Sequence, residues 1–240
     1  MSPKVWLSFE KQTRDGTLMK LRIQDLPLER IGVATELMVK YFARDEPYRK
    51  ATGFPNNPEA LEEYRVYINK IFREAASRNV MCCADTDDDN QDIIGISSVA
   101  VATESYWDMT AGKGTEEAKK INAIFYDVSH KFDILKEFNL SSYYSGKSLV
   151  VVPEYRGYGI AEKFLTVRRL MCGAHGIPMT AAWMSTFATQ IAAAKDGWQT
   201  LCELDYGDIA RRHGVSFEGV PPTNKYMAAW PLYESNRLDN

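Results

Sequence analysis

An apolar run of sequence ends in a turn that holds an arginine and two glycines and leads directly into a helical pattern. The run is Leu149–Val152, the turn contains Arg156, Gly157 and Gly159, and the helical pattern begins at Ile160. Free backbone N–H groups at a helix N-terminus attract anions together with the helix dipole. Glycine lets a ligand approach the backbone closely, and arginine adds a fixed positive charge. The spacing therefore predicts a site for a phosphate-like anion.

Two common phosphate motifs do not fit this turn. The chain has no GxxxxGK[ST] pattern of the Walker type, and Glu162 follows where a GxGxxG dinucleotide motif needs its third glycine. A nucleotide-hydride enzyme is therefore disfavoured. A strand–turn–helix connection that binds no ligand is the other interpretation, and the residues of the turn alone leave both open.

The residues that commonly bind metals are few and poorly spaced for that purpose. No histidine stands at ligand spacing from a cysteine or a carboxylate, so we expect no metal site. The acidic run Asp87–Asp89 lacks the spaced ligands and closing glutamate of a calcium loop, and is interpreted as a solvated hairpin tip. The cysteines form no CxxC pair and are expected to be reduced core residues. The histidines are His130, His175 and His213, and the cysteines are Cys82, Cys83, Cys172 and Cys202.

The overall composition is that of a globular protein. The 240 residues are 45% apolar and 25% charged, with a formal net charge of −3. That charge argues against general nucleic-acid binding, for which a basic face is expected. The sequence has no run of 18 apolar residues and no apolar core of a signal peptide at its start. We therefore expect a cytoplasmic monomer that does not enter membranes.

Patterning along the chain predicts alternating helices and strands. Apolar and polar residues alternate in some segments and recur at helical spacing in others. Asp25 is expected to cap the first helix and Pro47 to follow its end, and the second and third strands to form an antiparallel hairpin. The predicted strands are 17–24, 80–84, 93–102, 143–152, 179–184, 197–204 and 225–230, and the predicted helices are 27–43, 58–77, 115–138, 160–174 and 187–195.

This order of elements predicts one α/β domain over residues 1–240, with a mixed central sheet flanked by helices. The continuous apolar run Leu149–Val152 predicts a central strand that is buried on both faces. The anion-binding turn would then follow the central strand of the sheet.

The turn resembles a known family motif. Arg156-x-x-Gly159-x-Ala161 is similar to the Arg/Gln-x-x-Gly-x-Gly/Ala pyrophosphate motif of the GNAT acetyltransferase superfamily, and the residues before it, LVVVPEYRG, resemble that family's fourth strand and its exit. The resemblance implies a GNAT fold with acetyl-CoA as cosubstrate. Leu149, Val150 and Val151 would pair with the pantetheine arm, and the pyrophosphate would lie on a stretch of six residues. Those six are Arg156, Gly157, Tyr158, Gly159, Ile160 and Ala161.

A narrower resemblance, to the insect arylalkylamine N-acetyltransferases, extends in order and spacing over nearly the whole chain. It is carried by Trp6-Leu7 with Phe9, Ile23–Leu26, the Asp45-Glu46-Pro47 motif and a long helical insertion before the turn. It implies a small-molecule amine as acceptor and Glu46 as the general base. A carboxylate suits this role, because only about one alkylammonium in a thousand is neutral at pH 7.

Three more residues receive roles from the same resemblance. Ser185 and Thr189 fall on a pair of serines that would organise the site, and the threonine keeps only the hydroxyl of its serine counterpart. No histidine is spaced to activate a serine nucleophile, so direct transfer is expected. Tyr206 lies where the superfamily often places a tyrosine that protonates the leaving thiolate; a packed sheet tyrosine is the alternative.

The sequence leaves the acceptor open. An aromatic amine needs a flat apolar slot, whereas a polyamine needs a second acidic group to balance its second charge. The basic residues after Pro47 favour the aromatic monoamine, and a protein that binds acyl-CoA without turnover remains a further alternative. Candidates for the slot are Tyr48, Phe54, Trp107, Tyr143 and Tyr144, and those for the acidic group are Asp45, Glu104 and Asp108.

Overall fold

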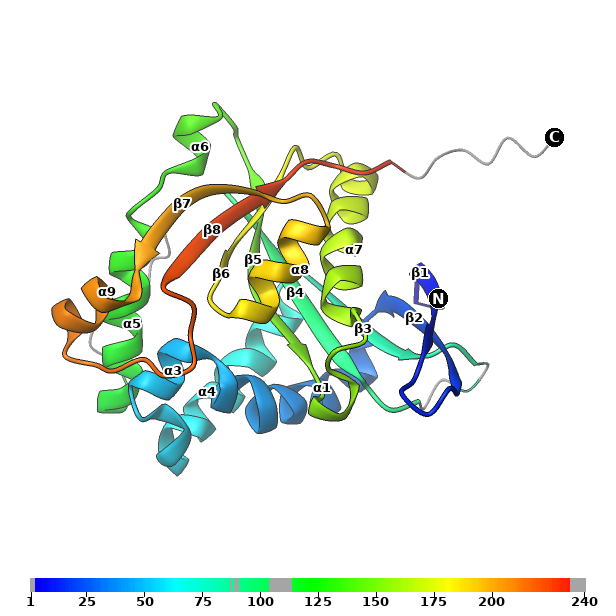
Figure 1. Ribbon diagram of the computed structural model, residues 1–240, viewed down its shortest axis with the longest axis horizontal. Helices are drawn as coiled ribbons and strands as arrows, with labels where there is room; N and C mark the ends of the chain where they lie inside the picture. The colour runs from blue at the N-terminus through cyan, green and yellow to red at the C-terminus, as the bar shows by residue number, and fades with distance from the viewer. Residues whose placement is uncertain (1–2, 87, 89–90, 104–113, 234–240) are drawn as a thin grey trace.

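The computed structural model describes residues 3–86, 88, 91–103 and 114–233. One twisted sheet runs through this part of the chain, with its strands in the order β1-β2-β3-β4-β5-β6-β8-β7 (Figure 1). The strands are β1 (Val5–Gln12), β2 (Leu18–Asp25), β3 (Ser77–Ala84), β4 (Gly95–Ala102), β5 (Tyr143–Val151), β6 (Thr180–Met184), β7 (Gln199–Asp205) and β8 (Thr223–Ala229).

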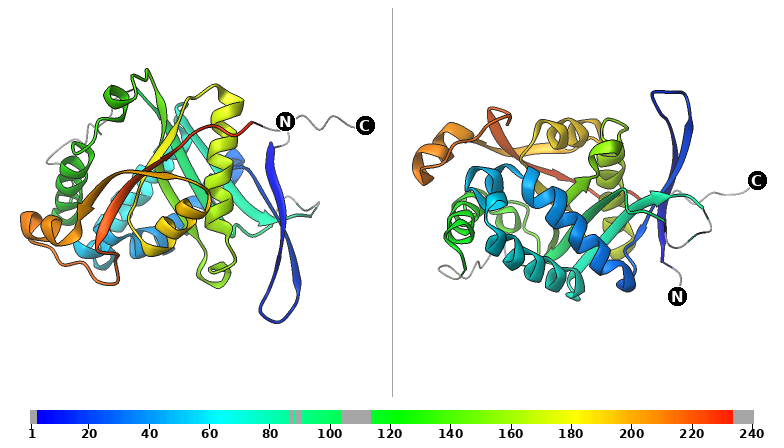
Figure 2. Two further views of the ribbon diagram at one scale, coloured as in Figure 1. Left: turned by 45° about the horizontal axis from the view of Figure 1, so that its top comes forward. Right: turned by 90° about the horizontal axis from the view of Figure 1, so that it is seen from below.

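The sheet is mixed, as predicted. Strands β5 and β6 are parallel, and the other neighbouring strands are antiparallel. The predicted hairpin is β3 and β4, which pair antiparallel from Ser77↔Ala100 to Cys82↔Gly95. Asp87 and Asp89 of its predicted tip lie outside the described residues. The β1–β2 ribbon extends away from the rest of the molecule (Figure 2).

Helices cover both faces of the sheet. Side chains alternate between faces along a strand: Met81 and Cys83 pack in the core with α1, α4 and α5, and Val80 and Cys82 pack against α7. The α-helices are α1 (Ile31–Leu37), α2 (Ala43–Asp45), α3 (Pro47–Ala51), α4 (Pro58–Arg73), α5 (Glu116–Ser129), α6 (Ile134–Glu137), α7 (Ile160–His175), α8 (Phe187–Lys195) and α9 (Tyr206–His213), and the shorter turns are Leu28–Arg30, Met38–Phe42, Phe54–Asn56 and Pro153–Tyr155.

Strand β5 lies between β4 and β6 and is covered on both sides. Val150 packs in the core of α1, α4 and α5, and Val151 packs in the core of α7. The prediction of a central strand buried on both faces is therefore confirmed. Eight residues separate the end of β5 at Val151 from the start of α7 at Ile160, and the two glycines of the turn are among them.

The first helical region is broken at the place that matters for the site. Helix α1 passes through a π-helical turn at Met38–Phe42 into α2, and Glu46 leaves the helix with φ −68° and ψ 125°. Pro47 then begins α3, because proline's fixed φ and missing N–H suit the first turn of a helix. This break places Asp45 and Glu46 at a corner between two helices.

Several sequence-based expectations were wrong. Asp25 does not cap a helix: it ends β2 and accepts a 2.7 Å hydrogen bond from Trp6 Nε1, and Pro27 precedes a 3-10 turn instead. Strand β1 was not predicted, because an edge strand alternates only weakly in hydrophobicity. The short helices α3 and α9 also were not predicted, and α9 is stabilised by a cap from Asp205 to the N–H of Asp208.

Candidate active site

A cavity of about 1530 Å³ opens where β5 and β6 separate. The two parallel strands pair only at Tyr144↔Thr180 and Ser145↔Ala181, whereas β5 continues to Val151. Within the described chain, the backbone of β5 beyond these pairs has no ladder to β6. It therefore presents an edge to which an extended ligand can add like a strand. The cavity is lined by residues of α3, α4, α5, β5, β6, α7 and α8.

A bulge in β5 and a buried arginine accompany this separation. Ser98 pairs with Ser148 and Val99 with Gly146, which leaves Lys147 as the extra residue. Arg168 of α7 donates from Nη2 to the carbonyl of Ser148 at 2.7 Å, and burial lowers the pKa of its guanidinium to about 10. Arg168 thus supplies a hydrogen-bond donor to the Ser148 carbonyl oxygen at the bulge.

Gly146 is required beside this arginine. A Cβ at this position would lie 2.6 Å from Arg168 Nη1 and 2.6 Å from Ala182 Cβ. Both distances are too short for real atoms, so a larger side chain would push Arg168 or β6 out of place. Neither Gly146 nor Arg168 was singled out from the sequence. The signal available was a polar residue inside the apolar stripe of α7.

The predicted anion-binding turn lies against the cavity. Gly157 has φ +89° and Gly159 has φ +76°, a left-handed conformation that side chains other than glycine rarely adopt. Gly159 is the N-cap of α7, and no side chain caps the helix there, so its first N–H groups are not occupied by a capping group. Arg156, Gly157, Gly159, Ile160 and Ala161 line the cavity together with Leu149, Val150 and Val151. The Tyr158 side chain instead packs against the core under α7.

Arg156 is held by two interactions. Its Nε donates to the carbonyl of Val151 at 2.9 Å, and its Nη2 donates to Asp45 Oδ2 at 2.6 Å. The ion pair is about half exposed on both sides. Arg156 therefore links the end of β5 to the corner that carries Glu46.

Glu46 is buried at the N-terminus of α3, with 8% of its surface exposed. Its Oε2 accepts from the backbone N–H of Arg49 at 3.0 Å and from Arg49 Nη1 at 3.3 Å. Burial raises the pKa of the Glu46 carboxyl, and the positive charge of Arg49 opposes that shift. The residue thus has a structural role as helix cap and the raised proton affinity that a general base uses.

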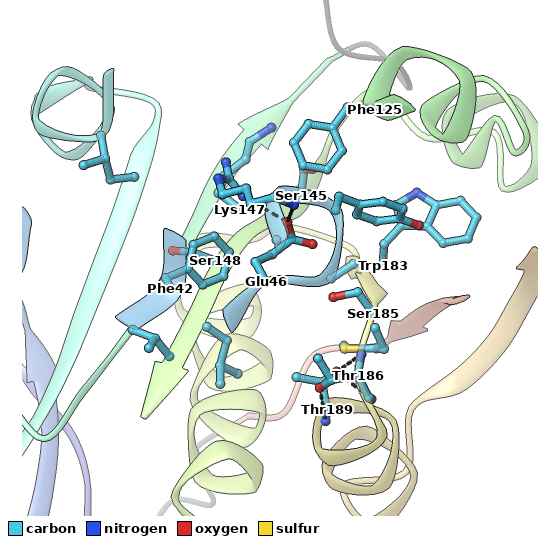
Figure 3. Close-up of a pocket in the computed structure, with 18 of the residues that line it drawn as sticks. Phe42, Glu46, Phe125, Ser145, Lys147, Ser148, Trp183, Ser185, Thr186 and Thr189 are labelled. Atoms are coloured by element: carbon cyan, nitrogen blue, oxygen red, sulfur yellow. Dashed lines mark hydrogen bonds and ion pairs between the residues drawn. The ribbon is translucent and has the colours of Figure 1, made fainter. Parts of the chain in front are cut away.

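Aromatic rings surround this ion pair. The guanidinium of Arg49 lies 4.6 Å from the ring centre of Tyr64 and 5.2 Å from that of Phe42. Figure 3 shows Phe42, Phe125 and Trp183 around the cavity that Glu46 faces. This end of the cavity is a largely aromatic chamber with one buried carboxylate.

The hydroxyl residues reach the cavity from the β6–α8 connection and from α8. Ser185 and Thr189 both line it (Figure 3). Thr189 also belongs to the capping box of α8: its Oγ1 accepts from the N–H of Thr186 at 3.2 Å and donates to the Thr186 carbonyl at 3.1 Å. A structural role therefore accounts for much of its hydrogen bonding.

Tyr206 is not among the residues that line the cavity. It is buried at the start of α9, and its hydroxyl donates to the carbonyl of Ser185 at 2.7 Å. Burial raises the pKa of its phenol far above the usual value. The structure therefore places Tyr206 behind Ser185, and its proton is already donated to the backbone.

The predicted aromatic candidates are divided between the two faces of the sheet. Tyr48, Phe54 and Tyr143 line the cavity. Tyr144, the next residue in β5, points to the opposite face, where its hydroxyl lies 2.7 Å from His175 Nδ1. Asp45 also lines the cavity. Trp107, Glu104 and Asp108 lie outside the described residues.

The described residues contain no group of three or more His, Cys, Asp or Glu side chains placed to hold a metal. In the same part of the chain, no helix combines the length and apolar composition of a membrane span. The four cysteines are unpaired; Cys82, Cys83 and Cys172 are buried, and Cys202 is partly exposed.

No protein-family model and no curated protein sequence matches the chain, but solved structures do. A putative arylalkylamine N-acetyltransferase 7 from the yellow fever mosquito Aedes aegypti is 28% identical, with a TM-score of 0.81 and 96% of each chain covered. Arylalkylamine N-acetyltransferase 2 from the same mosquito is 19% identical, with a TM-score of 0.69, 88% of this chain and 98% of that chain covered.

A polyamine N-acetyltransferase from Drosophila melanogaster, which forms N-acetylagmatine, has the same fold at 13% identity. Its TM-score is 0.68, with 87% of this chain and 97% of that chain covered. The chain therefore has the GNAT acetyltransferase fold, and its structure resembles the insect arylalkylamine N-acetyltransferases.

Proposed function

We propose that the protein is an N-acetyltransferase that moves an acetyl group from acetyl-CoA to the primary amine of a small arylalkylamine. One observation carries the proposal: a separated strand pair, a glycine turn at a helix N-terminus and a buried carboxylate all border one cavity. The first two suit a long ligand with a pyrophosphate, and the third suits removal of a proton from an amine.

The described residues fit acetyl-CoA. The free edge of β5 at Leu149–Val151 would pair with the amide groups of the pantetheine arm, in the manner of an added strand. The turn Arg156–Ala161 and the N-terminus of α7 would hold the pyrophosphate. When bound, acetyl-CoA supplies the acetyl group as a thioester.

Glu46 would accept the proton of the acceptor ammonium, directly or through water. At pH 7 the scarcity of neutral amine costs roughly 4 kcal/mol. The raised pKa of Glu46 brings its proton affinity closer to that of the amine. The amine nitrogen then attacks the thioester carbonyl, and backbone N–H groups of β5 near Val151 would hold the oxyanion. The C–S bond breaks, and the CoA thiolate takes up the proton that the nitrogen loses as the amide forms.

Ser185 and Thr189 would organise the site without forming an acyl-enzyme. Tyr206 would hold Ser185 in place through the Ser185 carbonyl, since its hydroxyl proton is already donated there. This role replaces the expected one of protonating the leaving thiolate.

A polyamine or agmatine acceptor is the second candidate. Glu59, Glu62 and Glu63 of α4 and Glu74 directly after it line the cavity, and carboxylates attract additional ammonium groups. The aromatic chamber around Arg49 favours a ring over an aliphatic chain, which is the reason for placing arylalkylamines first.

Calorimetry with acetyl-CoA followed by a thiol-release assay tests the proposal. The assay compares tryptamine, tyramine, dopamine, histamine, agmatine and spermidine under one condition. We expect binding of acetyl-CoA and turnover of the aromatic amines. Absence of binding at millimolar acetyl-CoA would reject the proposal. Binding without turnover of any amine would indicate a protein that only binds acyl-CoA. A tenfold preference for agmatine or spermidine would show that the acceptor is a polyamine or agmatine and not an arylalkylamine.

A further inference from the structure

Lys147 enters the cavity because of the bulge in β5. It is the extra residue between Gly146 and Ser148, opposite Ser98 and Val99 of β4. A bulge disturbs the alternation of side chains and redirects the extra residue. Lys147 lines the cavity from the central strand, and Figure 3 shows it in the same chamber as Phe125 and Ser145. Neither the anion-binding turn nor the proposed base makes use of it.

The charge of Lys147 persists at neutral pH. Burial lowers the pKa of its ammonium to about 8, and the carboxylate of Glu74 opposes that shift. A lysine with a pKa of about 8 is mostly protonated at pH 7. The cavity wall therefore carries a real positive charge, placed on a central strand of the sheet.

Glu74 is the carboxylate that this charge compensates. It follows the last residue of α4 and lines the cavity at its exposed rim. Two other glutamates of α4 are bonded to groups of the protein: Glu62 pairs with Arg65, and Glu63 accepts from the N–H and hydroxyl of Thr115. Lys147 thus offsets the negative charge of Glu74 in this part of the cavity.

We propose that Lys147, compensated by Glu74, is a specificity-determining residue that restricts the acceptor to amines with a single positive charge. The proposal rests on the amine N-acetyltransferase function proposed above. The reactive ammonium is balanced by Glu46. A second ammonium on the acceptor would meet Lys147, which cancels the attraction that Glu74 would otherwise exert, so the loss of hydration of that ammonium is not compensated. Neutral aromatic ends meet no such penalty.

The test measures the ratio of kcat/KM for agmatine to kcat/KM for tryptamine at pH 7. Lys147→Met keeps the length of the side chain and removes its charge, so Glu74 becomes uncompensated and attracts the second positive charge of agmatine. We expect the ratio to rise by about tenfold or more. Lys147→Arg keeps the charge and should leave the ratio within about twofold of wild type. Lys147→Gln is a second neutral variant, should Lys147→Met fold poorly in a thermal melt.

Glu74→Gln added to Lys147→Met should abolish most of the gain, because the attracting carboxylate is then gone. Lys119→Met is the matched control, since Lys119 is an exposed lysine of α5 that pairs with Glu116 outside the cavity; its ratio should equal that of wild type. An active wild type whose ratio is unchanged by both neutral variants would overturn this inference alone. A wild type that acetylates no amine would overturn the proposed function as well.

Discussion

Arg156 Nη2 lies 2.6 Å from Asp45 Oδ2, and these residues are 111 positions apart in the chain. The contact joins the turn before α7 to the helix corner that holds Glu46. One exposed ion pair therefore links the turn proposed to hold the pyrophosphate to the helix corner that carries the proposed base. Pyrophosphate and Asp45 would compete for the same guanidinium.

Competition of this kind predicts opposite effects for the two partners. Arg156→Ala should weaken acetyl-CoA binding by about tenfold or more, because a charge-assisted contact to phosphate is lost. Asp45→Asn should strengthen binding by up to about fivefold, since an exposed ion pair of roughly 0–1 kcal/mol no longer has to be broken. Calorimetry at low and high salt measures both. Arg65→Ala, which removes exposed pairs with Glu36 and Glu62, serves as control. Equal losses in Arg156→Ala and Arg65→Ala would contradict the phosphate role.

Gly159 should matter for acetyl-CoA beyond its effect on stability. Gly159→Ala places a Cβ on a residue with φ +76°, which costs about 1–2 kcal/mol. Gly176→Ala is a matched control, because Gly176 has φ +65° at the other end of α7 and lies outside the cavity. Both variants should show similar drops in melting temperature. Only Gly159→Ala should raise the KM for acetyl-CoA, and an equal change in KM for both would be evidence against the turn as a phosphate site.

Glu46→Gln should lower kcat/KM by roughly 10²–10⁴ at pH 7. The amide keeps an oxygen for the N–H of Arg49, so the cap of α3 is largely retained. The ionised carboxylate is the base, and the pKa of Glu46 is raised above its ordinary value of 4.5, so wild-type activity should fall with decreasing pH already above pH 4.5. The variant should lack this acid limb and recover activity at high pH, where free amine is abundant.

Asp133→Ala is the control for the loss of a helix cap alone, because it removes the side-chain cap of α6 outside the cavity. This variant should lose about 1 kcal/mol of stability and keep its kcat. A Glu46→Gln enzyme as active as wild type at pH 7 would exclude Glu46 as the base.

Tyr206→Phe should have a small effect on catalysis. The variant loses the hydrogen bond to the Ser185 carbonyl, so we expect kcat/KM to fall less than about tenfold. The alkaline side of the pH–rate profile should match that of wild type. A loss of 10² or more together with a changed alkaline limb would restore Tyr206 as the general acid.

We expect sequential kinetics, because neither Ser185 nor Thr189 forms an acyl-enzyme in the proposed mechanism. Thr189→Ser should retain the capping box of α8, whereas Thr189→Ala should cost about 1 kcal/mol of stability. Initial-rate patterns with both substrates varied should intersect for the wild type and for Ser185→Ala. Parallel lines, or an acetylated peptide that contains Ser185, would show an acyl-enzyme and refute direct transfer.

Local features of this protein could be predicted from its sequence. The turn Arg156–Ala161, the buried run of β5 and helix α8 at Phe187–Lys195 depend on neighbouring residues: glycines for positive φ, apolar runs for burial, and helical spacing. Those short-range preferences remain the same wherever the segment packs.

The tertiary structure decided which of these residues meet. It buried the local Glu46–Arg49 pair and brought Asp45 to Arg156; it placed Lys147 in the cavity through a bulge, and put Tyr206 behind Ser185 rather than in the cavity. Each of these depends on how strands pair and helices pack over long sequence separations, where a one-residue change in register turns a side chain to the other face.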